Sequence, residues 1–525
     1  MKKNKQLIFV ISVILLTMFF FMYAVTITWD SAHYMTYVNI LEGVLPFNNW
    51  DVVRGPVFPV MIYLSNLVFG KTVQGLLMFS YSFYLIMLLF AYKILKDILP
   101  DNKRKYKIII FTLLSIIFNP IIFGYYHVLL TEFVAMTLAV LYCYLAYKWI
   151  NADQLNIKKT ILYTIVFALL TVISWFLKQP YVSVALFPLL IALVIKILKK
   201  ENIKQKLISV GVFIVCFISL VISISCWNNV LESKGLNTST DRNPTTTLGN
   251  SFIEGLNCFE IIYGDEFKLE EKSKKYFSNS EIKKIEKHIK NKDTSYIILN
   301  VKKDNKIIET NYIDVSSNNL STFESIKLLL KNIISHPILV IDSYLTNYLS
   351  IIDIYRVECE DGTMHEPTKI FDLKFVNELS SIGMKPYSYT SNIFYITDEA
   401  YDRVVNYEQF NQAPKLLNYG MIILSKVAIL LFKIIFIILP IGFIFSIIKR
   451  ITTKNNKYDM VIILFGFSLL HLLLHVVTGA IIDRYAMPAY IPTFLGTILF
   501  VNLLIKKKEV KKNGKSKNIN HNTSL

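Results

Sequence analysis

Long apolar runs separated by short polar stretches dominate this chain of 525 residues. A helix rises about 1.5 Å per residue, so roughly 20 apolar residues are needed to cross a hydrocarbon core about 30 Å thick. The runs that approach this length are 7–27, 73–92, 107–124, 128–147, 160–177, 180–198, 206–226, 418–448, 458–479 and 485–505. The pattern predicts a mainly α, polytopic integral membrane protein with about ten transmembrane helices.

One further apolar run, 57–70, is too short to cross a bilayer. Pro56 and Pro59 suit the first turn of a helix, where a missing N–H costs little, and Gly70 suits its end. We therefore expect a helix over 57–70 that lies in the membrane interface. The preceding stretch, 28–56, reads as a loop.

Lysine and arginine gather in alternate loops. With the N-terminus in the cytoplasm, the inner segments hold about half of the 56 cationic residues; these segments are 1–6, 93–107, 148–159, 196–206, 449–457 and 506–525. Both termini are then cytoplasmic and 227–417 lies outside. No small-x-small cleavage site follows the first run, so we expect it to remain as a span rather than be removed as a signal peptide.

The chain thus divides into four regions. Residues 1–226 form an N-terminal module of seven spans plus the interfacial helix, and 227–417 form an extracytoplasmic domain. Residues 418–505 add three spans, and 506–525 is a polar tail expected to be cytoplasmic and disordered. Within the outer domain we expect mixed α/β structure, with helices over 326–334 and 338–352 and strands over 294–301 and 391–397.

Composition agrees with this class. Hydrophobic residues make up 54% of the chain and the mean hydropathy is +0.45. The net charge of +18 comes from the inner loops, which would meet anionic lipid headgroups, so membrane lipids are expected partners and nucleic acid is not.

Metal and disulfide signals are weak. The outer cysteines are Cys226, Cys258 and Cys359, an odd number without metal-ligand spacing, and free thiols are the favoured interpretation. His471 and His475 share one helix face at a spacing that can bind metal, but no third ligand is visible. The sequence indicates no certain cofactor and leaves a divalent metal open.

Five charged residues lie at or just beyond the ends of apolar runs, on the face predicted to be outside; these are Asp30, Arg54, Glu132, Lys178 and Arg484. An ionisable residue at a membrane is by default a functional hypothesis. Carboxylates and cations gathered at one face indicate an anionic, lipid-borne substrate.

The motifs around these residues resemble one family. An acid follows the first span at Asp30, and an Arg-x-Pro-x-x-Pro pattern follows over 54–59. An acidic turn over 126–132, a Lys-Gln-Pro turn over 177–180 and an Arg-Tyr-x-x-Pro pattern over 483–488 complete the set. Together they resemble the GT-C superfamily of polyprenyl-phosphate-dependent glycosyltransferases, which includes protein O-mannosyltransferases and aminoarabinose–lipid A transferases.

The resemblance implies a membrane glycosyltransferase whose donor is a polyprenyl-phosphate-linked sugar and whose acceptor is an envelope glycan, lipid or protein on the extracytoplasmic face. One carboxylate opposite a cationic phosphate clamp predicts that the transfer inverts the anomeric centre. The Lys/Asn/Ile-rich composition and the lack of an organelle signal favour a bacterial cell membrane. Asp30 takes the position of the catalytic base. The expected substrate-binding residues are Arg54, His127, Glu132, Lys178, Arg484 and Tyr485. Many members of the family carry Asp-Glu where this chain has Asp30-Ser31. Any role that the second acid has in those members, including metal binding, therefore does not carry over to this chain.

Other interpretations remain open. Arg54 can simply pair with Asp51, Glu132 can stabilise a helix N-terminus, and Arg484 can pair with Asp483. An O-antigen-type polymerase or ligase that uses a lipid-linked oligosaccharide would share the multi-span plan. A secondary transporter would also carry membrane charges, although it should show inverted repeats, which this sequence lacks.

Overall fold

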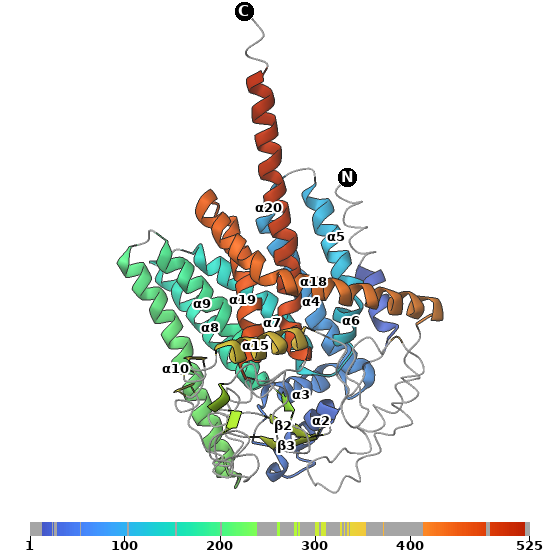
Figure 1. Ribbon diagram of the computed structural model, residues 1–525. Coiled ribbons are helices and arrows are strands. Elements are labelled where there is room, and N and C mark those ends of the chain that lie inside the picture. Colours follow the sequence, from blue (N-terminus) through green and yellow to red (C-terminus); the bar gives the residue numbers. More distant parts are fainter. Residues whose placement is uncertain are drawn as a thin grey trace, which may run out of the picture. The chain divides into compact units, whose positions relative to one another are not determined.

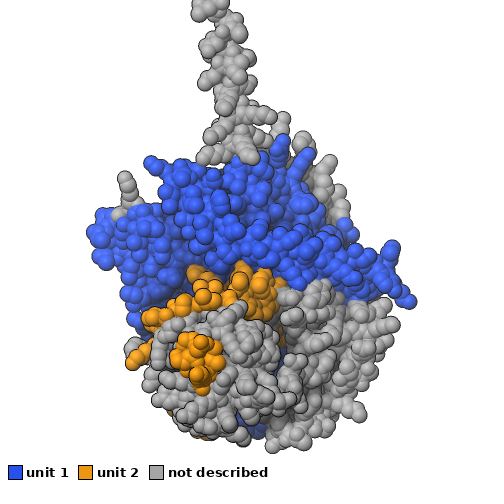
Figure 2. Space-filling view, viewed as in Figure 1, with its two compact units in different colours: residues 1–225, 357–469, 487–525 blue, residues 226–356, 470–486 orange. Residues whose placement is uncertain are grey.

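The computed structural model is mostly helical in its described part (Figure 1). That part comprises residues 13–23, 25, 29–52, 54–101, 104–152, 155–199, 202–238, 413–478 and 483–519, with short stretches between 260 and 371. The chain divides into two compact units, coloured in Figure 2, and each is described by itself. Unit 1 comprises Met1–Ser225, Val357–Leu469 and Met487–Leu525; unit 2 comprises Cys226–Arg356 and Leu470–Ala486.

Helices make up the described part of unit 1. From the N-terminal side they are α2 (Trp29–Leu41), η1 (Phe47–Asn49), α3 (Val57–Phe69), α4 (Val73–Ile98), α5 (Lys105–Ile117), α6 (Pro120–Tyr125), α7 (Thr131–Ile150), α8 (Ile157–Leu177), η2 (Gln179–Tyr181) and α9 (Val182–Leu198). Then follow α10 (Ile203–Ser233), α18 (Lys415–Thr453), α19 (Lys457–Thr478) and α20 (Met487–Ile519), of which α10 and α19 run on into unit 2.

Eight described helices are long and apolar enough to cross a membrane; they correspond to α4, α7, α8, α9 with η2, α10, α18, α19 and the first part of α20. The polytopic helical class predicted from the sequence is therefore confirmed. The first predicted span, 7–27, lies partly outside the described residues, and its residues 13–21 are helical.

The run 107–124 differs from the expected single span. It forms α5, of 13 residues, and α6, of 6 residues, with a break between them. The side chain of Asn119 accepts hydrogen bonds from the backbone N–H groups of Ile121 and Ile122, and Pro120 begins α6. A capping asparagine followed by proline starts a new helix and cannot continue the old one, which explains the break.

Two short α-helices, α2 and α3, with the 3-10 helix η1 between them, occupy the described region between the first run and α4. The helix expected over 57–70 is present as α3, and Gly70 ends it with a φ of 81°. The region 28–56, expected as a loop, contains α2 instead. Almost every described residue of α2 is buried, so packing rather than an apolar stripe stabilises this helix, and its sequence gave no periodic signal.

Helix α7 is central to unit 1. It packs against α4, α9 and α20 (Figure 1). Most of its residues are buried. Its 20 residues give a length of about 30 Å, which matches the thickness of a hydrocarbon core. Helix α7 is therefore long enough to cross a hydrocarbon core as one continuous element.

The described part of unit 2 is small. Strands β1 (Glu260–Ile262), β2 (Asn300–Lys303) and β3 (Lys306–Thr310) form a sheet in which β1 pairs with β2 in parallel and β2 pairs with β3 antiparallel. Helix α15 (Pro337–Ile351), expected over 338–352, packs against η6 (Asp483–Ala486). The predicted strand 391–397 and two of the outer cysteines, Cys258 and Cys359, lie outside the described residues.

The C-terminal tail also differs from expectation. Residues 506–519, expected to be disordered, continue α20 as far as Ile519. Lysine and glutamate are good helix formers, so a helix already nucleated by a membrane span extends readily into this polar sequence.

Candidate functional site

Helix α2 presents a polar face at its first turns. Asp30 and Tyr34 are four residues apart, so their side chains lie on the same side of the helix. Both are buried, with exposed fractions of 7% and 2%. A carboxylate at the first turn also suits the positive end of the helix dipole.

Arg54 reaches this face from the turn that precedes α3. Its Nη2 lies 3.0 Å from Oδ1 of Asp30, and its Nη1 donates to the hydroxyl of Tyr34 at 3.3 Å. The guanidinium carbon is 5.5 Å from the centroid of the Tyr34 ring. The indole N–H of Trp50 donates to the Arg54 carbonyl at 2.9 Å and fixes the turn. The guanidinium thus pairs with Asp30 across 24 residues of sequence, and the backbone carbonyl of Asp51 accepts the backbone N–H of Arg54.

Gly55 brings this turn against the end of α8. A Cβ atom at Gly55 would lie 2.1 Å from the carbonyl oxygen of Phe176, so only glycine allows the two backbones to approach this closely. Phe176 is two residues before Lys178. The contact therefore holds the Arg54 turn beside the residue that ends α8.

The second ion pair lies between α7 and this same end of α8. Nζ of Lys178 is 3.6 Å from Oε1 of Glu132, whose side chain is fully buried while that of Lys178 is 15% exposed. The hydroxyl of Thr131 donates to the other carboxylate oxygen at 3.3 Å. Glu132 occupies the first turn of α7, so the helix dipole and Lys178 both stabilise its charge.

The two ion pairs meet around one phenol. Burial raises the pKa of Tyr34. The charges of Lys178 and Arg54 act to lower this pKa, whereas the charges of Asp30 and Glu132 act to raise it. All four charges are thus close enough to act on the same hydroxyl. Two carboxylates and two cations give a balanced cluster at one end of α7, and four of the five charged residues singled out in the sequence belong to it.

Ser31, the residue after Asp30, is held by a hydrogen bond to the loop before α7. Its hydroxyl donates to the carbonyl of Leu129 at 2.6 Å, and its side chain is fully buried. Ser31 therefore ties α2 to the loop before α7. Each neighbouring carboxylate, Asp30 and Glu132, already faces a cation, so these residues do not fit a divalent metal. In the described part of the chain no three His, Cys, Asp or Glu residues are grouped to hold one.

His127 lies outside this cluster. Its two ring nitrogens lie 2.8 Å from the carbonyl of Phe123 and 2.9 Å from that of Phe20. Its ring stacks on Phe123, with centroids 4.2 Å apart. Burial lowers the pKa of His127 to about 4, although both carbonyls act to raise it. Both ring nitrogens face backbone carbonyls, and the neutral ring can donate to one of them, so this geometry gives His127 a packing role.

Arg484 and Tyr485 belong to unit 2, within η6. Arg484 is 8% exposed, and its guanidinium lies 5.7 Å from the ring centroid of Tyr485. The Tyr485 carbonyl is 2.7 Å from Nε2 of His471, and the Tyr485 ring stacks on His475. The histidine pair on α19 therefore contacts η6.

Two residues of the cluster were not found from the sequence. Tyr34 carries no motif, and only its spacing of four from Asp30 marks it once α2 is known to be a helix. Gly55 stands inside the Arg-x-Pro pattern, where it reads as an ordinary turn residue. Its close contact with α8 depends on the packing of segments far apart in the chain.

No family model, no curated protein and no solved structure matches the chain. The resemblance to the GT-C superfamily thus rests on the quoted motifs alone. A function has to be argued from the site itself, because fold class does not imply chemistry.

Proposed function

We propose that the protein is a membrane glycosyltransferase that moves a sugar from a polyprenyl-phosphate donor to an envelope glycan, lipid or protein on the extracytoplasmic face. Its architecture would be GT-C-like, with about ten spans, a mixed α/β outer domain and cytoplasmic termini. The observation that carries the proposal is the pair of ion pairs, Asp30–Arg54 and Glu132–Lys178, at one end of α7.

This cluster contains the groups that the reaction needs. The acceptor hydroxyl attacks the anomeric carbon as its proton passes to the carboxylate of Asp30. The bond from that carbon to the phosphate oxygen breaks, and its electron pair leaves with the polyprenyl phosphate. Arg54 and Lys178 hold the charge that grows on this phosphate. A single displacement of this kind inverts the anomeric centre.

The ion pairs imply that the donor binds before Asp30 becomes an effective base. While Arg54 lies 3.0 Å from Asp30, it stabilises the carboxylate and makes it a weak base. The donor phosphodiester offers Arg54 two non-bridging oxygens that share one negative charge, which a planar guanidinium can bind with two hydrogen bonds. Once Arg54 turns to the phosphate, Asp30 loses its counter-charge and becomes a stronger base. Tyr34, which accepts from Arg54, would hold the guanidinium in position during this exchange.

Lys178 would make the same exchange from Glu132. The carboxylate of Glu132 is the more deeply buried of the two acids, which suits it to orienting Lys178 rather than to proton transfer. Arg484 and Tyr485 are proposed as further donor-binding residues in unit 2. We assign no substrate contact to His127.

The test separates donor binding from transfer. Purified protein would be reconstituted in vesicles and given a polyprenyl-phosphate sugar, with binding and transfer measured independently. Asp30→Asn should lower transfer on the order of 10²–10⁴-fold, since it removes the base but keeps the shape. The same variant should bind the donor at least as tightly as the wild type, because Arg54 no longer has a competing carboxylate. Asp97→Asn is a matched control: Asp97 pairs with Lys148 at 2.7 Å, at the opposite end of α7.

Near-normal transfer by Asp30→Asn would eliminate Asp30 as the base. No transfer by the wild type with any polyprenyl-phosphate sugar, but activity with a lipid-linked oligosaccharide, would favour a polymerase or ligase instead. Uptake of a solute into the vesicles that depends on Asp30 would favour a secondary transporter.

A further inference from the structure

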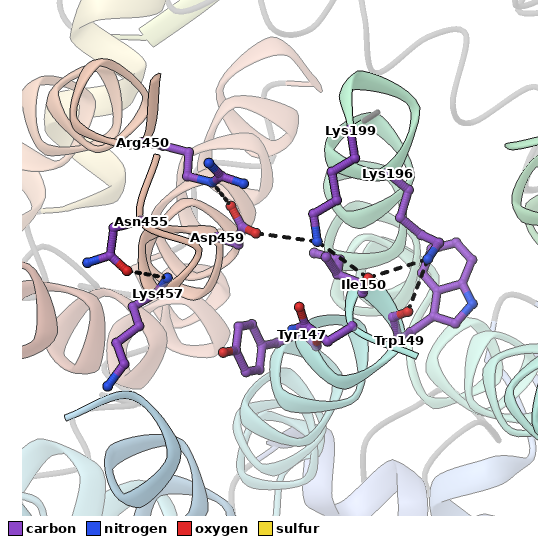
Figure 3. A network of polar contacts seen from close by, with 10 residues as sticks. Tyr147, Trp149, Ile150, Lys196, Lys199, Arg450, Asn455, Lys457 and Asp459 are labelled. Atoms are coloured by element: carbon purple, nitrogen blue, oxygen red, sulfur yellow. Dashed lines mark hydrogen bonds and ion pairs between the residues drawn. The ribbon is translucent and has the colours of Figure 1, made fainter. Parts of the chain in front are cut away.

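The other end of α7 carries a second charge cluster, at which α7 and α9 end and α19 begins. Nζ of Lys196 lies 3.4 Å from the carbonyl oxygens of both Trp149 and Ile150, and Nζ of Lys199 lies 3.5 Å from that of Ile150 (Figure 3). The last carbonyls of a helix have no partner within it and carry the negative end of its dipole. Two lysines from α9 therefore satisfy the end of α7.

A buried acid joins the same cluster. Asp459 lies in the first turn of α19 and is fully buried. Nε of Arg450, from the last turn of α18, donates to one of its carboxylate oxygens, and Nζ of Lys199 is 3.7 Å from the other. Figure 3 shows Asp459 between these two side chains. With Lys196, the cluster has three cations and one carboxylate.

This excess of positive charge is partly open to the surface. The side chain of Arg450 is 23% exposed and that of Lys199 is 20% exposed, whereas Asp459 below them has no exposed surface. Arg450 uses Nε for Asp459, and its two Nη groups donate to no residue in the described part of the chain. Arg450 and Lys199 are partly exposed and carry more positive charge than the buried Asp459 neutralises, so together they form a site that attracts an anion.

The depth of the site indicates where the anion comes from. The 20 residues of α7 span about 30 Å, so this end lies at the phosphate layer of one leaflet when the Glu132 end lies at the other. Basic pockets between membrane helices at this depth are suited to lipid headgroups. We propose that Arg450 and Lys199, which together outnumber the buried Asp459, bind the phosphate of an anionic membrane lipid. The proposal is independent of the glycosyltransferase function.

The experiment uses the full-length protein in nanodiscs of phosphatidylcholine. Phosphatidylglycerol would be added stepwise, and its binding followed by native mass spectrometry together with the melting temperature. The wild type should bind phosphatidylglycerol in preference to phosphatidylcholine. Arg450→Gln and Lys199→Gln should each lower this affinity roughly tenfold, the loss expected for one charge-assisted contact. Lys158→Gln is the matched control, since Lys158 is exposed at the start of α8, at the same end of α7.

Asp459→Asn distinguishes a lipid site from a purely structural cluster. Removal of the carboxylate leaves the site more positive, so phosphatidylglycerol should bind at least as tightly to the folded variant as to the wild type. A wild type without preference for phosphatidylglycerol overturns the proposal on its own, even if some variants fail to fold. Full stabilisation of the wild type by inorganic phosphate in phosphatidylcholine alone, with no further effect of phosphatidylglycerol, would also overturn it and indicate a free anion as ligand. Equal loss of affinity in the Lys158 control would show a general surface-charge effect.

Discussion

The two ends of α7 handle charge in different ways. At the Thr131 end, Asp30 and Glu132 face Arg54 and Lys178, so acids and cations balance. At the Ile150 end, the buried carboxylate of Asp459 pairs with Arg450 and Lys199. Lys196 adds a third cation. A balanced cluster can accept an anionic group only by giving up an internal ion pair, whereas an over-charged cluster can accept one directly. The first arrangement suits a substrate that must trigger a change, and the second suits a resident lipid.

The comparison also predicts how each end tolerates loss of a charge. The fully buried Glu132 pairs with Lys178. Asp459 pairs with both Arg450 and Lys199, so one of these cations still faces it when the other is removed. Removal of one cation should therefore cost more at the Thr131 end.

Lys178→Ala should give the largest effect. It removes the cation that lies 3.6 Å from the fully buried Glu132, and breaking a buried ion pair costs roughly 3–5 kcal/mol. Lys199→Ala leaves Asp459 with Arg450 and should cost only about 1 kcal/mol. The free energy of unfolding in mixed micelles would measure both. The double substitution Glu132→Leu/Lys178→Met should recover most of the loss, because no uncompensated charge remains. Equal costs at the two ends would contradict the comparison.

Gly55→Ala tests how the Thr131 end is assembled. A Cβ there would meet the Phe176 carbonyl oxygen at 2.1 Å, so the turn or α8 must move. We expect a loss of stability of roughly 1–3 kcal/mol, the usual cost of overpacking, together with lower transfer activity as Arg54 shifts. Gly211→Ala is the control, since a Cβ at Gly211 in α10 meets nothing within 4 Å and alanine favours a helix by about 1 kcal/mol. A Gly55→Ala protein with normal stability and activity would show that the close contact is dispensable.

A further effect, confined to low pH, concerns His33. Burial, helped by the charge of Arg54, lowers the pKa of His33 on α2 from 6.5 to about 4, while Asp30 and Asp51 oppose the shift. In the unfolded chain His33 binds a proton near pH 6.5, whereas in the folded protein it binds one only near pH 4. The free energy of unfolding therefore falls as the pH drops from 6.5 to 4. At pH 5 the loss from His33 is about 2 kcal/mol.

His33→Gln should remove that part of the pH dependence. Melting temperatures of the wild type and the variant would be compared at pH 7.5 and pH 5. The expected result is a smaller drop in the variant. His127, whose pKa is also lowered to about 4, should keep part of the dependence in both proteins. An identical drop in the two proteins would show that His33 does not titrate in this window.

Much of the architecture could be predicted because bilayer thickness sets helix length. Eight of the predicted spans are present as long apolar helices, and the short helix after Pro56 is present as α3. The prediction of a loop over 28–56 is wrong, because this region contains α2, which is buried on nearly all sides and shows no apolar stripe. The break at Asn119–Pro120 was readable in principle, because a capping asparagine before proline marks a helix start.

For the candidate site, the residue types and their positions at the ends of apolar runs were visible in the sequence. Asp30, Arg54, Glu132 and Lys178 were all selected on that basis. The sequence does not show which acid pairs with which cation, because an ion pair between residues 24 or more positions apart depends on how the helices pack. The sequence suggested local pairs such as Arg54 with Asp51, and the structure brings Arg54 to Asp30 instead.

The sequence by itself determined the class of the protein and the residues that carry charge at the ends of its helices. Length and polarity decide these properties, and both are local. Only the tertiary structure decided which acid faces which cation, that Tyr34 lies among four charges, and that Asp459 gathers Arg450 and Lys199. These contacts depend on backbone approaches such as Gly55 against Phe176, which a linear pattern does not encode. Helix ends are set by neighbouring residues, but partners across helices are set by packing.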